Sequence, residues 1–277
     1  ALVAALSAYP LFSLGLNCST GIEHMLPLIR RLAEISPFRT SAHPNAGFPD
    51  QEGHYRQTPQ ELASLITDEL HHGRLNIIGG CCGTTEDHIA ALAEAAVGAP
   101  VRTLPASKQG LQASGLEPLA SASDFSFIAV GERANVAGSK KFARLIKQRK
   151  FEEALVIAKR QIDQGAAIID ICMDDPLIDP VESMVTFLRL ASAEPEIARV
   201  PFMIDSSQWP VIEAALKEIQ GRALVNSISL KEGAELFIAR ARHIVRMGAA
   251  VVVMLFDETG QADTFERKCA IAERAYR

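Results

Sequence analysis

The chain has 277 residues and a formal net charge of −5, with 48% hydrophobic and 22% charged residues. This acidic balance argues against a general nucleic-acid binder, because no basic surplus is available to neutralise phosphates. No apolar run reaches the ~18–20 residues that a membrane span needs, so no membrane partner is expected.

The cysteine count indicates a reducing compartment. Five cysteines, an odd number, are spread over the whole chain and do not resemble a secreted disulfide framework. No basic segment precedes the apolar stretch at residues 1–14, so we see no secretory signal and expect a cytoplasmic protein. The chain begins with Ala1 and both ends read as helices, so we expect a piece of a longer polypeptide.

The first third of the chain alternates strand and helix patterns. Strands are predicted at 11–17, 38–43 and 74–79, and each is followed by an amphipathic helical run. The helix "TPQELASLITDELHHG" has the clearest ends: Thr58 is its expected cap, Glu61 completes a capping box and Gly73 follows its end. These three β-α units predict one domain over residues 1–98.

The periodicity stops between Gly98 and Asp124. This stretch is rich in Pro, Gly, Ser and Ala, which is typical of a connecting segment. We therefore predict a linker over 99–124 and a second domain over 125–277.

The second domain repeats the alternation. Strands are predicted at 125–131, 166–172, 200–206, 222–228 and 249–256, and helices at 151–164, 180–193, 207–219, 233–247 and 263–276. Repeated β-α units indicate parallel strands with right-handed crossovers, as in a (β/α) barrel or a doubly wound sheet. No G-x-G-x-x-G opens a helix, which weakens a dinucleotide-binding interpretation. Neither domain reaches the eight strands of a complete barrel.

Three cysteines follow the carboxyl ends of the first strands, where parallel α/β folds place ligand-handling residues. Cys18 follows the first strand, Asn45 the second, and the vicinal pair Cys81 and Cys82 the third. Three thiolates at one barrel mouth match the ligand count of a catalytic zinc with one open position. The alternative is a set of inert cysteines.

Acids and amides follow the strands of the second domain in the same way. They are Glu132, Asn135, Asp170, Asp205, Asn226, Asp257 and Glu258, accompanied by Arg133 and Ser139. With few basic residues among them, they suit a nitrogen-rich heterocycle better than a phosphate. The alternative is ordinary helix capping, since Asp, Asn and Ser are favoured caps.

Short motifs in both domains resemble known families. "GLNC", "HPNAG" and "GGCCGTT" resemble the homocysteine-binding barrel of homocysteine S-methyltransferases. "VGERANVAGSKKF", "IIDICMDD", "IDSSQWPVIEAALKEIQG", "VNSISLKEG" and "VVMLFDETGQADT" resemble the pterin-binding barrel of cobalamin-dependent methionine synthases. The resemblance covers nearly the whole chain.

The resemblance implies an α/β protein with two (β/α)8 TIM barrels in tandem, both incomplete in this chain. Residues 1–98 would be the C-terminal part of a homocysteine- and zinc-binding barrel, and residues 125–277 the N-terminal part of a barrel for 5-methyltetrahydrofolate. A cobalamin-binding domain of the same full-length enzyme would lie outside this chain.

Residue roles follow from the matching motifs. The resemblance implies zinc ligands Cys18, Cys81 and Cys82, with Asn45 as a fourth ligand when homocysteine is away. It implies folate contacts at Asn135, Gly138, Ser139, Lys140, Asp170, Asp205 and Asn226. Asp170, Asp205 and Asn226 are the ones expected to support catalysis, by assisting the positive charge that N5 must gain.

The implied activity is methyl transfer from 5-methyltetrahydrofolate through cobalamin to zinc-activated homocysteine. One alternative is a cobalamin-independent homocysteine methyltransferase fused to a barrel resembling dihydropteroate synthase. Another is a non-catalytic scaffold stabilised by zinc.

Overall fold

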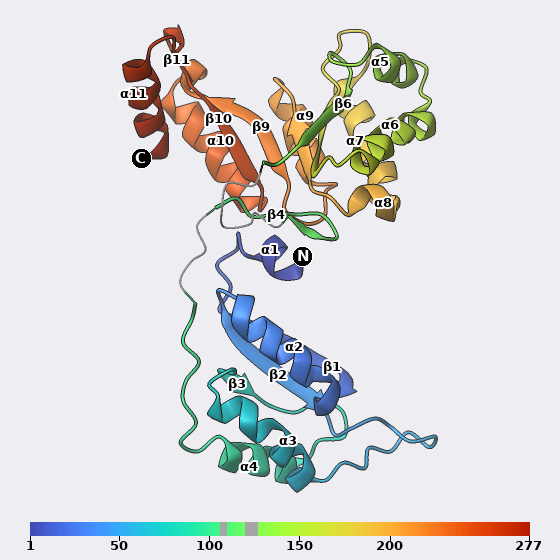
Figure 1. Cartoon of the computed structure of the whole chain (residues 1–277), viewed down its shortest axis with the longest axis vertical. Helices are drawn as coiled ribbons and strands as arrows, with labels where there is room; N and C mark the ends of the chain where they lie inside the picture. Colours follow the sequence, from blue (N-terminus) through green and yellow to red (C-terminus); the bar gives the residue numbers. More distant parts are fainter. Residues whose placement is uncertain (106–109, 120–126) are drawn as a thin grey trace. The chain divides into compact units, whose positions relative to one another are not determined.

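The computed structural model describes residues 1–105, 110–119 and 127–277 (Figure 1). Its contacts divide the chain into two compact units. We call Pro10–Lys108 the smaller unit, and Ala1–Tyr9 with Gln109–Arg277 the larger unit. In the part of the chain that is described, no helix is both long and apolar enough to cross a membrane.

The smaller unit is a three-stranded parallel sheet in the order β1-β2-β3, with a helix after each strand. Its elements are β1 (Ser13–Gly21), α2 (Ile22–Ile35), β2 (Arg39–Asn45), α3 (Pro59–His71), β3 (Ile77–Ile78) and α4 (Glu86–Ala95). Its core joins the apolar faces of the helices to the sheet through Ile22, Met25, Ile29, Ala42, Leu62, Ile66, Leu70, Leu75 and Leu92.

Helix α3 begins as the sequence predicts. The Thr58 hydroxyl accepts a hydrogen bond from the Glu61 amide, and the Glu61 carboxylate accepts one from the Thr58 amide, which completes the capping box. The buried Glu69 carboxylate on the same helix forms ion pairs with Arg30 and Arg74, so its charge is paired.

The larger unit is built on a five-stranded parallel sheet in the order β10-β9-β8-β7-β6. Its strands are β6 (Val130–Asn135), β7 (Ile168–Cys172), β8 (Phe202–Asp205), β9 (Leu224–Ser229) and β10 (Ala250–Met254). Its helices are α1 (Leu2–Leu6), α5 (Lys140–Lys147), α6 (Phe151–Asp163), α7 (Pro180–Ala193), α8 (Pro195–Ala198), α9 (Trp209–Leu216), η1 (Leu230–Glu232), α10 (Ala234–Arg246) and α11 (Phe265–Tyr276). Two short hairpins complete it: β4 (Ala113–Ser114) with β5 (Pro118–Leu119), and β11 (Phe256–Asp257) with β12 (Gly260–Gln261).

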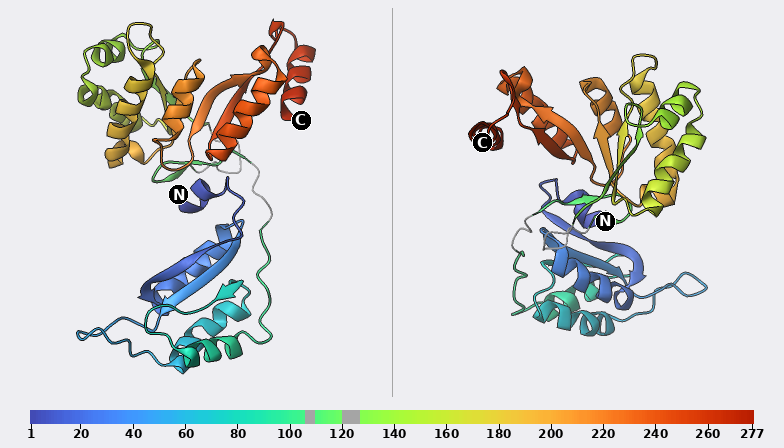
Figure 2. Two further views of the ribbon diagram at one scale, coloured as in Figure 1. Left: turned by 180° about the vertical axis from the view of Figure 1, so that it is seen from behind. Right: turned by 45° about the horizontal axis from the view of Figure 1, so that its top comes forward.

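Side chains of this sheet alternate between two apolar clusters. Ile169, Ile171, Ile204 and Val225 pack into the cluster that the helices share, and α6 contacts β6 and β7 while α10 contacts β9 and β10 (Figure 2). Ile168, Met203 and Leu224 belong to a second cluster, which includes Ala113 of the β4–β5 hairpin. Because strand side chains alternate with period two, Asp170, Asp205 and Asn226 share the face of this second cluster, one step nearer the carboxyl ends.

The predicted α/β class is confirmed, and each sheet has the parallel β-α pattern of a TIM barrel. Neither sheet closes on itself among the described residues. The last strand of the first domain is shorter than predicted, because only Ile77 and Ile78 pair with β2. The strand predicted at 125–131 lies instead at Val130–Asn135, and residues 125 and 126 fall outside the described residues.

The predicted linker 99–124 lies only partly within the described residues, which omit 106–109 and 120–126. The parts that are described make specific contacts. The buried Arg102 guanidinium donates to the carbonyl oxygens of Ala33, Ser36 and Phe38 at the end of α2. Ser114 of the β4–β5 hairpin exchanges backbone hydrogen bonds with Arg222. The boundaries 1–98 and 125–277 stay predictions.

Candidate functional site

Three sulfur atoms meet at the carboxyl end of the smaller sheet. Cys18 Sγ lies 3.6 Å from Cys82 Sγ, and Cys81 Sγ lies 3.9 Å from Cys82 Sγ. All three atoms lie within 4.8 Å of one another. The structure therefore brings together the three cysteines predicted from the sequence, although Cys18 lies 63 and 64 residues before Cys81 and Cys82 in the chain.

Backbone hydrogen bonds fix the vicinal pair against β2. The Cys81 amide donates to the Pro44 carbonyl at 2.8 Å, and the Ala46 amide donates to the Cys82 carbonyl at 2.9 Å. The buried Asn45 side chain accepts from the Cys82 amide at 3.2 Å. Asn45 therefore lies beside the sulfur cluster, and one lone pair of its side-chain oxygen accepts the Cys82 amide.

Cys18 occupies an unusual backbone conformation. Its φ angle is 63° and that of Ser19 is 64°, the left-handed region that residues with a Cβ rarely adopt. Such backbone strain is commonly found at functional sites. The register between β1 and β2 shifts at this point, between Asn17 and Gly21, so the chain leaves the regular strand where it presents the thiol.

Two of these thiols, those of Cys18 and Cys81, have pKa values shifted in opposite directions. The Ser19 backbone amide, followed by the Cys82 and Cys81 side chains, lowers the pKa of Cys18. Hydrogen bonding to Cys18, followed by burial, raises the pKa of Cys81. A thiolate at Cys18 is therefore favoured over one at Cys81.

Tyr55 packs against the residue that follows the vicinal cysteines. A Cβ on Gly83 would lie 2.2 Å from Tyr55 Cβ and 2.4 Å from its Cγ, and the Gly83 φ angle is +77°. Both the space and the backbone angle therefore require glycine. Burial, followed by the charge of Cys82, raises the pKa of Tyr55.

The donor set of the sulfur cluster fits a soft or borderline metal ion. Three cysteine sulfurs, one from β1 and two from the segment after β3, leave a coordination position open, as in catalytic zinc sites. Asp50, Glu52 and His54 form a second group with metal-ligating atoms close together, but it lies on an exposed loop. The sulfur cluster is thus the candidate metal centre.

In the larger unit, Asn135 joins the two predicted acids. Its Nδ2 donates to Asp170 Oδ2 at 3.3 Å and to Asp205 Oδ2 at 3.2 Å. Its Oδ1 accepts from the Ala137 and Gly138 amides, both at 2.9 Å. These two amide donors orient the side chain, so its NH2 group faces the carboxylates.

Asp170 is 3% exposed, and its Oδ1 has no hydrogen-bond partner among the described residues. Burial, reinforced by the negative charge of Asp205, raises the pKa of Asp170 to about 6. Burial also raises the pKa of Asp205, helped by the charge of Asp174. The site is therefore acidic and short of donors, which suits a ligand that brings N–H groups.

The other predicted folate contacts lie at the start of helix α5 and on strand β9. Ser139 caps α5 by accepting from the Phe142 amide, and the exposed Lys140 is the first residue of that helix. Asn226 on β9 is the ladder partner of Asp205 on β8. The structure thus brings Asn135, Asp170, Asp205 and Asn226 together, with Gly138 supplying an amide to Asn135.

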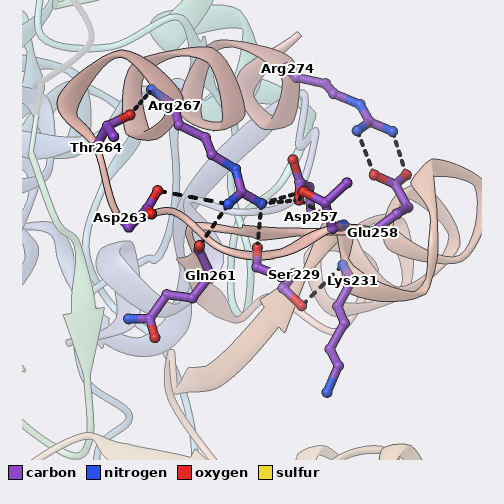
Figure 3. Close-up of polar contacts among 11 residues, drawn as sticks. Ser229, Lys231, Asp257, Glu258, Gln261, Asp263, Thr264, Arg267 and Arg274 are labelled. Carbon is purple, nitrogen blue, oxygen red and sulfur yellow. Dashed lines mark hydrogen bonds and ion pairs between the residues drawn. The ribbon is translucent and has the colours of Figure 1, made fainter.

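Asp257 and Glu258 do not contribute free carboxylates to this ring of acids. The Asp257 carboxylate accepts hydrogen bonds from Thr259 and Arg267. The Glu258 carboxylate accepts hydrogen bonds from both terminal nitrogens of Arg274 (Figure 3). Bonding to Thr259 and Arg267 lowers the pKa of Asp257 to about 2, and Arg274 lowers that of Glu258 to about 2. The sequence expectation for this pair is thus corrected: both acids bind arginines of α11.

Sequence reasoning did not single out Tyr55 or Asp174. Asp174 accepts three hydrogen bonds from the segment after β8, and a sequence gives no direct sign of such a contact between loops. Cys172 is buried at the end of β7, and burial raises its pKa to about 12.

Comparison with protein families agrees with this division of the sites. Residues 1–96, which hold the sulfur cluster, match the homocysteine S-methyltransferase family. Residues 131–277, more than half of the chain, match the pterin binding enzyme family. The chain thus belongs to the pterin binding enzymes and carries a homocysteine S-methyltransferase segment ahead of its pterin-binding domain.

Proposed function

We propose that this chain is part of a cobalamin-dependent methionine synthase, which moves the methyl group of 5-methyltetrahydrofolate to homocysteine with cobalamin as the carrier. The observation that carries the proposal is the order of the two families in one polypeptide. A homocysteine segment and a pterin domain together supply a methyl acceptor and a methyl donor. The cobalamin-binding domain is proposed to be a partner within the same full-length enzyme.

The sulfur cluster is proposed as the homocysteine centre. Cys18, Cys81 and Cys82 would hold zinc, which when bound lowers the pKa of a coordinated thiol and so keeps homocysteine as a thiolate. The proximity of the three sulfurs and the lowered pKa of Cys18 support this role. Asn45, beside the cluster, is the proposed fourth ligand in the absence of homocysteine.

The acid and amide group is proposed as the pterin site. Its unpartnered Asp170 Oδ1 and the Asp205 carboxylate can accept N–H groups of a pterin, and Asn226 adds an amide beside them. Asn135, Gly138, Ser139 and Lys140 complete the proposed folate contacts. Over the whole reaction, the N5–CH3 bond of the folate breaks and an S–CH3 bond forms. The thiol gives up a proton and N5 gains one.

The proposal extends to location. All five cysteines are free, which supports a reducing compartment and therefore the cytoplasm.

A turnover experiment on the full-length protein tests the function. Homocysteine and 5-methyltetrahydrofolate are supplied with and without cobalamin, and methionine is measured. We expect methionine only when all three are present. Methionine formed without cobalamin would favour the cobalamin-independent alternative. Zinc retention without any turnover would favour the scaffold.

A further inference from the structure

Asp174 lies two residues beyond the end of β7 and binds the segment that follows Asp205. Its Oδ1 accepts from the Ser206 hydroxyl at 2.6 Å. Its Oδ2 accepts from the Ser207 amide and the Ser207 hydroxyl, each at 2.7 Å. One carboxylate therefore holds two consecutive residues through three short hydrogen bonds, which are strong because the acceptor is charged.

The same segment is held from its other side. The Ser206 amide donates to the Asn226 carbonyl at 3.2 Å, and the Gln208 amide donates to the Ser206 hydroxyl at 3.0 Å. Ser206 is 3% exposed, so its hydroxyl is shielded from water, whereas Ser207 is exposed. The loop after β8 is thus tied to the loop after β7 and to strand β9.

Asp205 itself is held less firmly. Among the described residues, its carboxylate accepts one side-chain hydrogen bond, from Asn135 at 3.2 Å. The direction of this carboxylate therefore depends on its backbone, and Asp174 holds the two residues that follow it, through the Ser206 hydroxyl and the Ser207 amide.

We propose that Asp174 is a positioning residue of the pterin site, which holds Ser206 and Ser207 and thereby aims the Asp205 carboxylate at the ligand. The inference rests on the proposed function, because it takes Asp205 to be a folate contact. Asp174 itself does not touch the folate in this arrangement.

The neighbouring Asp175 provides a matched comparison. It is also half-buried and acidic, but its carboxylate pairs with Lys147 at 2.7 Å and accepts from the Leu177 amide. It makes no contact with the loop after β8 in the described hydrogen bonds. A substitution there changes the same charge without releasing Asp205.

The test compares Asp174→Ala, Asp174→Asn and Asp175→Ala in the full-length protein. Equilibrium binding of 5-methyltetrahydrofolate, the thermal unfolding midpoint and zinc content are measured. We expect Asp174→Ala to bind the folate about tenfold more weakly or worse. Asp174→Asn can accept from Ser207 and donate to Ser206, so it should stay within about threefold of the unsubstituted protein. Asp175→Ala should bind normally, and zinc should be retained in all three.

Ser207→Ala guards against a folding defect in Asp174→Ala. It removes one of the three hydrogen bonds at an exposed residue and should weaken folate binding by about threefold. Normal binding in Asp174→Ala or in Ser207→Ala would overturn the inference. Equal losses in Asp174→Ala and Asp174→Asn would also overturn it, because charge rather than geometry would then matter. If the unsubstituted protein failed to bind 5-methyltetrahydrofolate, the proposed function itself would fall.

Discussion

Single backbone angles and single amide contacts hold the sulfur cluster in place. Cys18 reaches the cluster from a left-handed backbone position, and the amides of Cys81 and Cys82 are fixed to Pro44 and Asn45. The positions of the thiols therefore depend on backbone geometry, because the segments that carry them are held by hydrogen bonds to β2.

Removing one sulfur tests the metal centre. Cys82→Ala leaves two thiolates, which are too few to hold a catalytic zinc. We expect loss of bound zinc and of homocysteine methylation, while folate binding stays unchanged. Zinc is measured by atomic absorption on the full-length protein, and the exposed Cys269→Ala serves as the matched control. Stoichiometric zinc in Cys82→Ala would contradict the assignment.

A substitution that conserves side-chain size tests the pterin site. Asp205→Asn keeps the size of the side chain and replaces one acceptor oxygen with a donor nitrogen. Losing a hydrogen bond to a charged group should cost roughly 1.5–3 kcal/mol in folate binding. Equilibrium titration with 5-methyltetrahydrofolate measures this, and zinc content is the internal control. Unaltered affinity would show that Asp205 is not a folate contact.

Asp170 should make folate binding dependent on pH. Its pKa of about 6 means that it is protonated below pH 6 and ionised above. An ionised carboxylate accepts N–H groups better, so folate affinity should increase as the pH rises through about 6. Asp170→Asn should remove this step in a titration series from pH 5 to about 7.5.

The same raised pKa has the opposite effect on stability. Between about pH 4 and 6 the native state holds a proton that the unfolded chain has released. This carboxyl therefore makes the fold less stable as the pH rises over that range.

The affinity prediction has a clear negative outcome. A folate affinity that did not change between pH 5 and 7.5 would contradict the role of Asp170.

The candidate site shows what a sequence can give at the scale of residues. Cys18, Cys81, Cys82, Asp170 and Asp205 were selected because parallel strands deliver their carboxyl ends to one edge. The contacts of Asp174 and Tyr55 come from loops that meet only after folding, so no spacing rule indicates them. The ion pair of Asp257 with Arg267 was likewise not predictable, because the sequence around Asp257 does not show that α11 packs back against the hairpin.

At the scale of elements, two arginines of α11 bind the hairpin after β10, and Arg267 makes contacts across its whole turn. Arg267 on α11 donates to Asp257 at 2.6 Å, to the Gln261 carbonyl at 2.9 Å and to the Gly260 carbonyl at 3.0 Å (Figure 3). It also binds the Thr259 hydroxyl. The guanidinium offers five donors in a fixed plane, which lets it bridge the whole turn.

Arg267→Ala should therefore loosen this hairpin. Amide exchange measured by mass spectrometry should become faster over 255–262, because the turn loses the donors that close it. Arg274→Ala is the matched control. Arg274 lies on the same helix as Arg267, and its substitution removes an exposed ion pair with Glu258 of the turn; such pairs contribute little. Unchanged exchange in Arg267→Ala would show that β11 and β12 hold the turn without it.

Elements with strong periodicity were predictable and short ones were not. Helix α7 (Pro180–Ala193) was predicted at its observed bounds, because Asp179 caps it and Pro180 occupies its first turn. Helix α5 was missed, since "KKFARLIK" is a short, mainly basic run. The β4–β5 hairpin was missed because two-residue strands carry no periodic signal.

At the scale of the whole molecule, each unit contains its own core and its own candidate site. The buried clusters of the smaller unit draw only on residues 22–92, and those of the larger unit only on residues 113–271. The sulfur cluster lies within the smaller unit, and the acid and amide group lies within the larger one.

This separation predicts that each ligand stabilises only its own unit. A ligand that binds the native state raises the unfolding midpoint of the segment that holds it. In calorimetry of the full-length protein, zinc removal should lower the transition of the homocysteine segment alone. 5-Methyltetrahydrofolate should raise the transition of the pterin domain alone. Cys82→Ala should abolish the first response and Asp205→Asn should reduce the second, with both effects present independently in the double variant. A single transition that responds to both ligands would contradict this prediction, because the two sites would then belong to one cooperative unit.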